Sequence, residues 1–276
     1  MVDGNTLLYA TVGDPVAQIR APQVMGAVFE KLAVNGVWVP MHVDQAGLLA
    51  VLQGLRTVRN FRAITVTIPH KQTVVAMLDR LSVAAQASGG VNMVRLDNDG
   101  KLFGDMVDGS GFVRGLELHG HHVQGAAVWL IGLGGGGSAI AAALAEARVA
   151  RLYLTEMNRE RATAVFERLG HYYPKVPIEI VNQPVGRVDF AINATPSGLK
   201  PGDPLPFDPA ILSRETVICD IIMKPKETAL IRAAESRGMR VHHGHHMLDS
   251  QIPMYLRFVN IPFSSDESIL EIARQA

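Results

Sequence analysis

The chain has 276 residues, a length that fits two ordinary domains or one large one. Its hydrophobic content of 48% excludes a disordered or collagen-like chain and predicts a sizeable core. The 26 basic and 26 acidic side chains balance and form no basic cluster, so the sequence favours a small-molecule ligand over nucleic acid or an anionic membrane surface.

A single cysteine, Cys219, excludes an internal disulfide framework and a cysteine-rich zinc site. It lies in the apolar run of residues 217–222, which predicts a buried strand and an unreactive core thiol. The N-terminus lacks the features of a signal peptide, and no uncharged apolar run is long enough to span a membrane. We therefore expect a cytoplasmic protein that is a monomer or a homodimer.

Strand-like and helix-like runs alternate in the first half of the chain. Periodicity predicts strands at residues 7–12, 37–43 and 63–68, with helices at about 23–32 and 46–55. Two further strands, at 91–96 and 101–104, flank a turn that ends in Asp99-Gly100, a strong hairpin signal. The sequence thus predicts a first domain, residues 1–106, with a mixed α/β sheet.

Strand-like and helix-like runs also alternate in the second half of the chain. The predicted strands lie at residues 126–131, 151–155, 178–181, 188–193, 217–222 and 240–241, with helices from Ser138 and at about 228–237. This pattern predicts a Rossmann-like, doubly wound parallel sheet in residues 107–245. Helices at about 248–258 and 266–274 form a C-terminal segment, residues 246–276, which we expect to return to the first domain.

A glycine-rich run follows the first strand of the second half and opens a helix. It matches the G-x-G-x-x-G pattern, in which glycines allow a tight turn and close approach of the backbone to a pyrophosphate. A merely flexible connection is the alternative, but it does not explain the strand before the run or the helix after it. The candidate cofactor-binding residues of this run are Gly132, Gly134, Gly135, Gly136 and Gly137.

Glu156 ends the next predicted strand, where a carboxylate can accept hydrogen bonds from the ribose hydroxyls of NAD. A 2′-phosphate at this position would be repelled by the carboxylate. Arg159 and Arg161 lie close enough in sequence to leave NADP open. NAD is therefore the preferred cofactor and NADP the alternative.

Lys71 and Asp108 are the candidate proton-transfer pair. Lys71 stands just past a strand end, and Asp108 precedes a predicted helix. Oxidation of an alcohol by hydride transfer needs a group that takes the hydroxyl proton, and a lysine can do so if its pKa is lowered or a carboxylate relays the proton. On spacing alone, a surface lysine and a helix-capping aspartate remain the commoner interpretation.

The residues resemble those of the shikimate and quinate dehydrogenase family through nearly the whole chain. In the first half the matching segments are Gly13-Asp14-Pro15-Val16-Ala17, Val66-Thr67-Ile68-Pro69-His70-Lys71, Gly90-Val91-Asn92, and Gly104-Asp105 through Asp108-Gly109. In the second half they are the glycine run, Asn193-Ala194-Thr195-Pro196-Ser197-Gly198-Leu199, and Met247-Leu248 with Gln251. These segments occur in the family's order and approximate spacing.

The resemblance implies an NAD(P)-dependent oxidoreductase that interconverts a ring hydroxyl and a ketone of shikimate or a related hydroxylated ring acid. It implies a substrate domain, a cofactor domain and a cleft between them. Lys71 and Asp108 correspond to the family's catalytic lysine and aspartate. Residues that correspond to its substrate-hydroxyl ligands are Thr67, Asn92 and Gln251, and those that correspond to its nicotinamide-side lining are Asn193, Thr195 and Gly244.

The chain departs from the family where the substrate carboxylate is normally held. Family members usually have two serines there, at the positions of Ile19 and Ala21. Missing hydrogen-bond donors change discrimination by orders of magnitude, so a ring compound with a less polar group fits this pocket better than shikimate. Arg20 could supply a replacement charge, but in an extended segment it would face away from its neighbours. Among the cofactor-binding positions, Met223 stands where family members commonly have a tyrosine, so a polar contact near the cofactor is missing.

Two alternatives stay open. One is a quinate or other polyol dehydrogenase that prefers NAD, and the other is a non-catalytic nucleotide or metabolite sensor. Retention of Lys71 and Asp108 favours an enzyme, because a sensor needs no proton relay. The histidine runs at 119–122 and 242–246 invite a metal interpretation. Closely spaced loop histidines are more often solvated turn residues, so we expect no functional metal.

Overall fold

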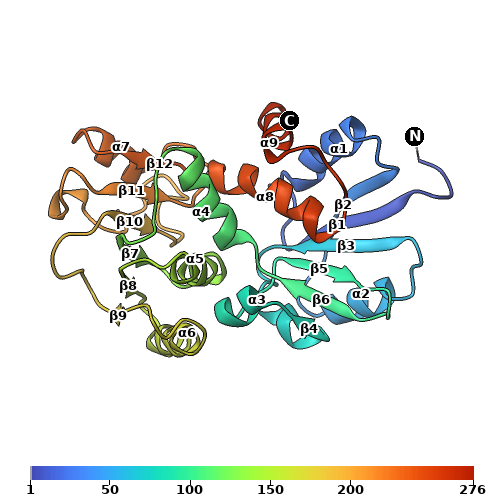
Figure 1. The fold of residues 1–276 in the computed structure, drawn as a ribbon, viewed down its shortest axis with the longest axis horizontal. Coiled ribbons are helices and arrows are strands. Elements are labelled where there is room, and N and C mark those ends of the chain that lie inside the picture. Colours follow the sequence, from blue (N-terminus) through green and yellow to red (C-terminus); the bar gives the residue numbers. More distant parts are fainter. Residues whose placement is uncertain (1) are drawn as a thin grey trace. The chain divides into compact units, whose positions relative to one another are not determined.

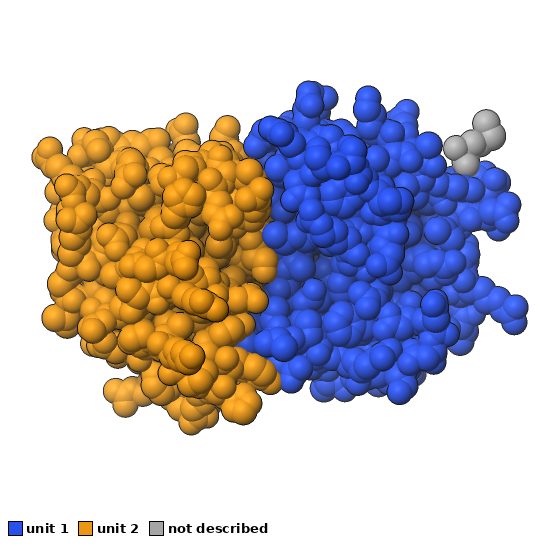
Figure 2. All heavy atoms as spheres, in the orientation of Figure 1, with its two compact units in different colours: residues 1–107, 249–276 blue, residues 108–248 orange. Residues whose placement is uncertain are grey.

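The computed structural model describes residues 2–276 and divides into two compact units, each considered by itself. Unit 1 consists of the chain up to Val107 together with Asp249–Ala276, and unit 2 consists of Asp108–Leu248 (Figure 2). Along residues 2–276, none of the helices combines the length and apolar character that crossing a bilayer requires.

Unit 1 is built on a six-stranded mixed sheet with the order β2-β1-β3-β5-β6-β4 (Figure 1). The strands are β1 (Leu7–Gly13), β2 (Gly36–His42), β3 (Phe61–Val66), β4 (Arg80–Leu81), β5 (Met93–Leu96) and β6 (Leu102–Asp105). Neighbours β2, β1 and β3 are parallel, whereas β5 is antiparallel to both β3 and β6. The mixed sheet predicted from the Asp-Gly hairpin signal is therefore confirmed.

Residues from both ends of the chain form the core of unit 1. Its helices are α1 (Ala21–Lys31), α2 (Leu48–Leu55), α3 (Val83–Ser88), the larger part of α8 (His245–Phe258) and α9 (Asp266–Gln275), with a 3₁₀ turn at Thr73–Met77. Figure 1 shows α9 beside α1. The core joins Tyr9, Met25, Phe29 and Trp38 to Ile252, Tyr255, Leu256, Phe258, Ile269 and Ala273. Burial of a large apolar side chain such as Ile252, Leu256 or Ile269 stabilises the fold by roughly 1.5–3 kcal/mol, so the C-terminal helices are a major part of this unit.

Unit 2 contains a six-stranded, wholly parallel sheet with the order β12-β11-β10-β7-β8-β9. The strands are β7 (Ala127–Ile131), β8 (Arg151–Thr155), β9 (Ile178–Ile180), β10 (Phe190–Asn193), β11 (Val217–Asp220) and β12 (Val241–His242). The chain runs outward from β7 in one direction and then returns to β10 on its other side, so the order reverses between β7 and β10. This confirms the predicted doubly wound sheet. Sheets of this kind generally bind ligands at the carboxyl ends of the strands near such a reversal.

The helices of unit 2 are α4 (Asp108–Leu118), α5 (Gly135–Glu146), α6 (Arg159–Tyr172), α7 (Ala229–Glu235) and the first turn of α8, with a 3₁₀ turn at Pro209–Ile211. Helix α5 is alanine-rich and almost fully buried, which lets α4 and α6 approach it closely. Hydrophobic periodicity did not predict α6. Its Asn158 side chain caps the helix, and Ala162, Val165 and Leu169 form its buried stripe.

Candidate functional site

The glycine run forms a tight turn between β7 and α5. Gly132 has a φ of +91°, and a Cβ there would lie 2.8 Å from the Thr195 Cγ2. A Cβ at Gly137 would lie 1.9 Å from the Gly132 carbonyl oxygen. Side chains are therefore excluded at both positions. Gly134 caps α5, and Gly135 and Gly136 begin its first turn, whose amide groups lack intrahelical acceptors and attract phosphate.

Glu156 follows β8 directly and points at this loop. Its carboxylate accepts the Leu133 amide over 2.8 Å and the Asn158 amide over 2.9 Å, and the Arg161 guanidinium lies 3.4 Å away. The side chain is 8% exposed. Burial alone would raise the pKa of Glu156, but the two amide hydrogen bonds and Arg161 outweigh it and lower the pKa below its usual value of 4.5. A fixed negative charge thus stands beside the glycine run.

Asn193 is the last residue of β10 and holds the following turn through hydrogen bonds. Its buried side-chain oxygen accepts the Thr195 amide over 3.0 Å and the Thr195 hydroxyl over 2.7 Å. Its amide group donates to the Asp220 carboxylate over 3.2 Å. Thr195 in turn lies against Gly132, so the residues predicted on the nicotinamide side and the glycine run share one sheet edge.

Asp220 is a residue that sequence reasoning missed. It is buried at the end of β11 and also accepts the Thr228 hydroxyl over 2.7 Å and the Ile222 amide over 3.0 Å. Burial raises the pKa of this carboxyl group. In the sequence, the feature that could have identified Asp220 is a carboxylate at the carboxyl end of an otherwise apolar strand.

Met223 and Gly244 lie on the segments that follow β11 and β12. Met223 is 42% exposed, in the connection to α7. Gly244 separates β12 from α8, and a Cβ there would stand 2.5 Å from the Ile221 carbonyl carbon. Gly244 thus lies at the same edge of the sheet as Asn193, whose carbonyl oxygen accepts the Ile221 amide over 3.1 Å.

In unit 1, the turn after β3 carries two of the predicted substrate-site residues. The Thr67 amide donates to the Val12 carbonyl over 2.9 Å, which fixes the start of the turn to β1. The fully buried His70 lies 2.6 Å through its Nε2 from the Val43 carbonyl oxygen, which anchors the other end beyond β2. The half-buried Lys71 follows at once. His70 therefore positions Lys71, a role that the sequence analysis did not assign.

Asn92 is held beside the same strand end. Its backbone amide donates to the Asp105 carbonyl over 3.0 Å, and its carbonyl accepts the Val66 amide over 2.8 Å. The buried side-chain oxygen accepts the Val107 amide over 2.9 Å. Because Val66 leads directly into Thr67, the structure brings Asn92 and the Thr67–Lys71 turn to one edge of the sheet.

Gln251 belongs to the part of α8 that lies in unit 1. Its buried side-chain oxygen accepts the Tyr255 hydroxyl over 2.5 Å. Tyr255 stacks on Trp38 at 6.3 Å between ring centroids, and the Trp38 indole donates to the Thr11 hydroxyl over 2.8 Å. The Thr11 and Thr65 hydroxyl oxygens are 2.7 Å apart. Buried polar networks of this kind make a site rigid. In the sequence, the only indication of this network was the presence of polar residues within apolar strands.

The segment at the expected carboxylate position is not extended. Arg20 has helical backbone angles (φ −99°, ψ −19°) as the cap of α1, and Ala21 is the first, buried residue of that helix. Strand alternation therefore does not decide where Arg20 points. Its guanidinium lies 3.8 Å from the Asp249 carboxylate, while Ile19 is half-buried.

Asp108 begins α4 and is buried. The next residue, Gly109, touches α5, because a Cβ at 109 would stand 2.0 Å from the Ala139 carbonyl oxygen and 2.8 Å from the Ala143 Cβ. This close crossing fixes the backbone that carries Asp108. The first turn of a helix also favours a negative charge.

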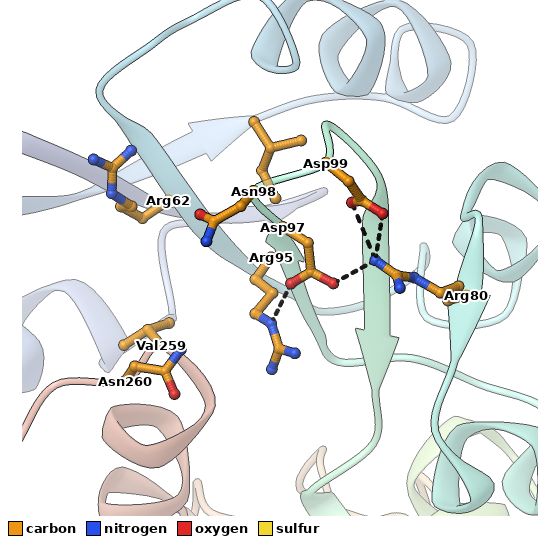
Figure 3. Close-up of a pocket in the computed structure, with 9 residues that line it drawn as sticks. Arg62, Arg80, Arg95, Asp97, Asn98, Asp99, Val259 and Asn260 are labelled. Carbon is orange, nitrogen blue, oxygen red and sulfur yellow. Dashed lines mark hydrogen bonds and ion pairs between the residues drawn. The ribbon is translucent and has the colours of Figure 1, made fainter.

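A pocket of about 490 Å³ lies elsewhere in unit 1 (Figure 3). Arg80 and Arg95 both turn toward the Asp97 carboxylate, at 2.8 Å and 2.7 Å, and Arg80 also reaches Asp99 at 3.1 Å. The charges of Arg80, Arg95, Asp97 and Asp99 are therefore paired with one another. The candidate substrate and cofactor residues are not among the described residues that line it.

The histidine run at 119–122 lies in a largely exposed turn, as expected, whereas the run at 242–246 is partly buried. His242 is 1% exposed, and its ring lies 5.8 Å from that of Phe112 and 5.4 Å from that of His119, between centroids. Burial, followed by the neighbouring histidines, lowers the pKa of His242 to about 3 and that of His246 to about 2. The structure brings both side chains to His119.

Comparisons with known proteins agree with this arrangement. A family model described as the shikimate dehydrogenase substrate binding domain matches residues 11–94. The shikimate dehydrogenase (NADP(+)) of Rubrobacter xylanophilus is 39% identical over 251 residues, which cover 90% of this chain and 88% of that protein. The structure of shikimate 5-dehydrogenase from Listeria monocytogenes, in complex with shikimate and NAD, is 26% identical, with a TM-score of 0.89 over 98% of this chain and 97% of that one. Shikimate dehydrogenase from Aquifex aeolicus is 27% identical, with a TM-score of 0.87 over 100% of both chains.

Proposed function

This chain belongs to the shikimate dehydrogenase family, and we propose that it interconverts a ring hydroxyl group and a ketone of shikimate or a related hydroxylated ring acid with NAD(P). The observation that carries the proposal is the presence, in one chain, of a glycine turn beside an ionised acid in unit 2 and of Thr67, Lys71 and Asn92 at one sheet edge in unit 1. A family relative carries shikimate and NAD together.

The residues of unit 2 fit a dinucleotide. The turn at Gly132 and Gly137 leaves no room for side chains, so a pyrophosphate can approach the backbone and the first turn of α5. Glu156 would accept the ribose hydroxyls, and Thr195 would lie toward the nicotinamide side. When bound, the nicotinamide supplies or accepts the hydride.

The residues of unit 1 would bind and deprotonate the substrate. Thr67, Asn92 and Gln251 offer hydroxyl and amide groups to the ring hydroxyls. Lys71, as the neutral amine, would take the proton from the hydroxyl that is oxidised and return it in the reverse direction. Asp108 would exchange that proton with Lys71. A positioned acid–base group of this kind contributes about 10²–10⁴-fold to the rate.

We propose NAD as the preferred cofactor, although curated relatives are named for NADP(+). Support comes from this chain's own Glu156, whose lowered pKa keeps it charged at neutral pH. Its two amide bonds hold the charge in place, where it would repel a 2′-phosphate. Arg161 offsets part of this charge.

A second candidate substrate is a ring polyol without the usual carboxylate. Ile19 and Ala21 offer no hydrogen bonds there, and Arg20 already faces Asp249. A neutral or less polar group would meet these side chains without leaving a charge unpaired.

The test is reduction of NAD and of NADP in the presence of shikimate, quinate and a panel of hydroxylated ring compounds. The full chain is compared with Lys71→Ala and with Lys101→Ala, an exposed lysine of the same unit. We expect turnover that Lys71→Ala abolishes and Lys101→Ala preserves, with unchanged thermal unfolding of both variants. Nucleotide binding without turnover of any compound would favour the sensor and overturn the proposal.

A further inference from the structure

Two histidine runs that are far apart in the sequence meet in unit 2. His119 follows α4, His242 ends β12 and His246 lies in the first turn of α8 (Figure 1). One ring nitrogen of each lies within 4.8 Å of the other two. The proposed dehydrogenase chemistry uses none of these three side chains.

The His119 and His246 rings are stacked at 3.7 Å between centroids, and a hydrogen bond to the backbone fixes the tautomer of His119. The His119 Nδ1 lies 2.8 Å from the Gly115 carbonyl oxygen, so it must donate, and the lone pair of this ring stands on Nε2. An imidazole that is fixed in this way by a backbone carbonyl is the usual arrangement of a metal-binding histidine.

The spacing of the other two rings fits a shared ion. The Nδ1 atoms of His242 and His246 are 3.5 Å apart. Two nitrogens at about 2.0–2.1 Å from a tetrahedral zinc ion stand about 3.3–3.4 Å from each other.

We propose that His119, His242 and His246 form a binding site for a late transition-metal ion, with Zn²⁺ as the physiological occupant. Three imidazoles select Zn²⁺, Ni²⁺ or Cu²⁺ and disfavour Mg²⁺ and Ca²⁺, which prefer oxygen ligands. A water molecule or a neighbouring ring, such as that of His245 at 4.2 Å between centroids from His246, would complete the tetrahedron.

The site would join three elements of unit 2. Its ligands come from the end of α4, the end of β12 and the start of α8, and Gly244 lies between two of them. A bound ion would therefore fix the β12–α8 turn against α4. The site is structural rather than catalytic, and it does not depend on the proposed substrate.

The experiment uses the full chain without a histidine tag, freed of metal by a chelator. Zn²⁺ is titrated calorimetrically and Co²⁺ by its visible absorption, for the wild type, His119→Ala, His246→Ala and the control His171→Ala, an exposed histidine of α6. We expect one equivalent of Zn²⁺ and the absorption of tetrahedral Co²⁺. Each cluster variant should weaken Zn²⁺ binding about tenfold or more, and the control should match the wild type.

Thermal unfolding without metal checks that the variants fold, and His119 is exposed, so its replacement should leave the fold intact. Zn²⁺ should raise the Tm of the wild type and of His171→Ala by the same amount and that of His119→Ala by clearly less. Absence of binding by the wild type would overturn the proposal. Weak binding of several ions that neither cluster variant changes would overturn it as well, because it would show adventitious surface binding only.

Discussion

Asn193 and Asp220 are register partners on β10 and β11, and the Asn193 amide donates to the Asp220 carboxylate over 3.2 Å. The same carboxylate accepts the Thr228 hydroxyl and the Ile222 amide. The Asn193 side-chain oxygen in turn accepts the Thr195 amide and hydroxyl. One buried acid thus ties the end of β11 to the turn that lies against the glycine run.

Asp220→Ala should lower the free energy of unfolding by about 1–3 kcal/mol, because three buried donors lose their acceptor. Asp220→Asn retains one side-chain oxygen and should cost clearly less. The nucleotide KM should rise with Asp220→Ala as the Thr195 turn loosens. Urea unfolding and steady-state kinetics measure both effects. Equal stability of the two variants would show that the network does not hold this edge.

Gly109→Ala should displace the first turn of α4, since the new Cβ would stand 2.0 Å from the Ala139 carbonyl oxygen. We expect a loss of about 1–3 kcal/mol of stability and a larger loss of kcat, because Asp108 moves with the turn. Gly170→Ala in α6 is the matched control, with open space around its Cβ, and should stabilise by about 0.5–1 kcal/mol. A variant at 109 with full activity would remove Asp108 from the mechanism or show that α4 tolerates the shift.

Glu156→Gln should raise the ratio of kcat/KM for NADP to that for NAD by about tenfold or more, because the charge that repels a 2′-phosphate is removed. Glu160→Gln, in the first turn of α6, is the control and should leave the ratio unchanged. The measurement is initial rate against each nucleotide. A wild type that prefers NADP, with no change in the variant, would contradict the NAD assignment.

Glu156 should also contribute to acid stability. Its folded-state pKa lies below the usual value of 4.5, so its contribution is fully present above pH 4.5 and is lost as the pH falls through the folded pKa. The stability difference between wild type and Glu156→Gln should therefore shrink below pH 4.5. Urea unfolding at a series of pH values tests this. A stability difference between the two proteins that grows as the pH falls would show that the folded-state pKa of Glu156 is raised, not lowered.

Ile19→Ser combined with Ala21→Ser should raise turnover of shikimate relative to a neutral ring polyol by about tenfold or more, because two hydroxyls would meet a carboxylate. Ala21 is the first, buried residue of α1, and Ile19 directly precedes the Arg20 cap. The measurement is kcat/KM of the wild type and of the double variant with each of the two substrates. An unchanged ratio would indicate that Arg20, beside Asp249, controls this end of the substrate.

The sequence predicted those turns whose shape depends on residues that are neighbours in the chain. The glycine run had to turn sharply between a strand and a helix, since side chains are excluded at Gly132 and Gly137. Asp99-Gly100 similarly predicted the hairpin that makes the first sheet mixed. These features depend on residues that are neighbours in the chain.

Features that depend on distant residues were not predictable in this way. The Arg20–Asp249 pair, the histidine cluster and the Tyr255–Gln251 contact beside Trp38 all require the chain to be folded first. Helix α6 was missed because its buried stripe of Ala162, Val165 and Leu169 is separated by charged residues. Hydrophobic periodicity alone cannot show which polar side chains will share a sheet edge.

The division of unit 1 into two stretches of sequence has a consequence for protein synthesis. Residues 108–248 leave the ribosome as one uninterrupted block and can fold during translation. Unit 1 begins first but needs Ile252, Tyr255 and Ile269 for its core, so it can be completed only after the last helix has been made. Of the two units, unit 1 is therefore begun before unit 2 and completes its core after it.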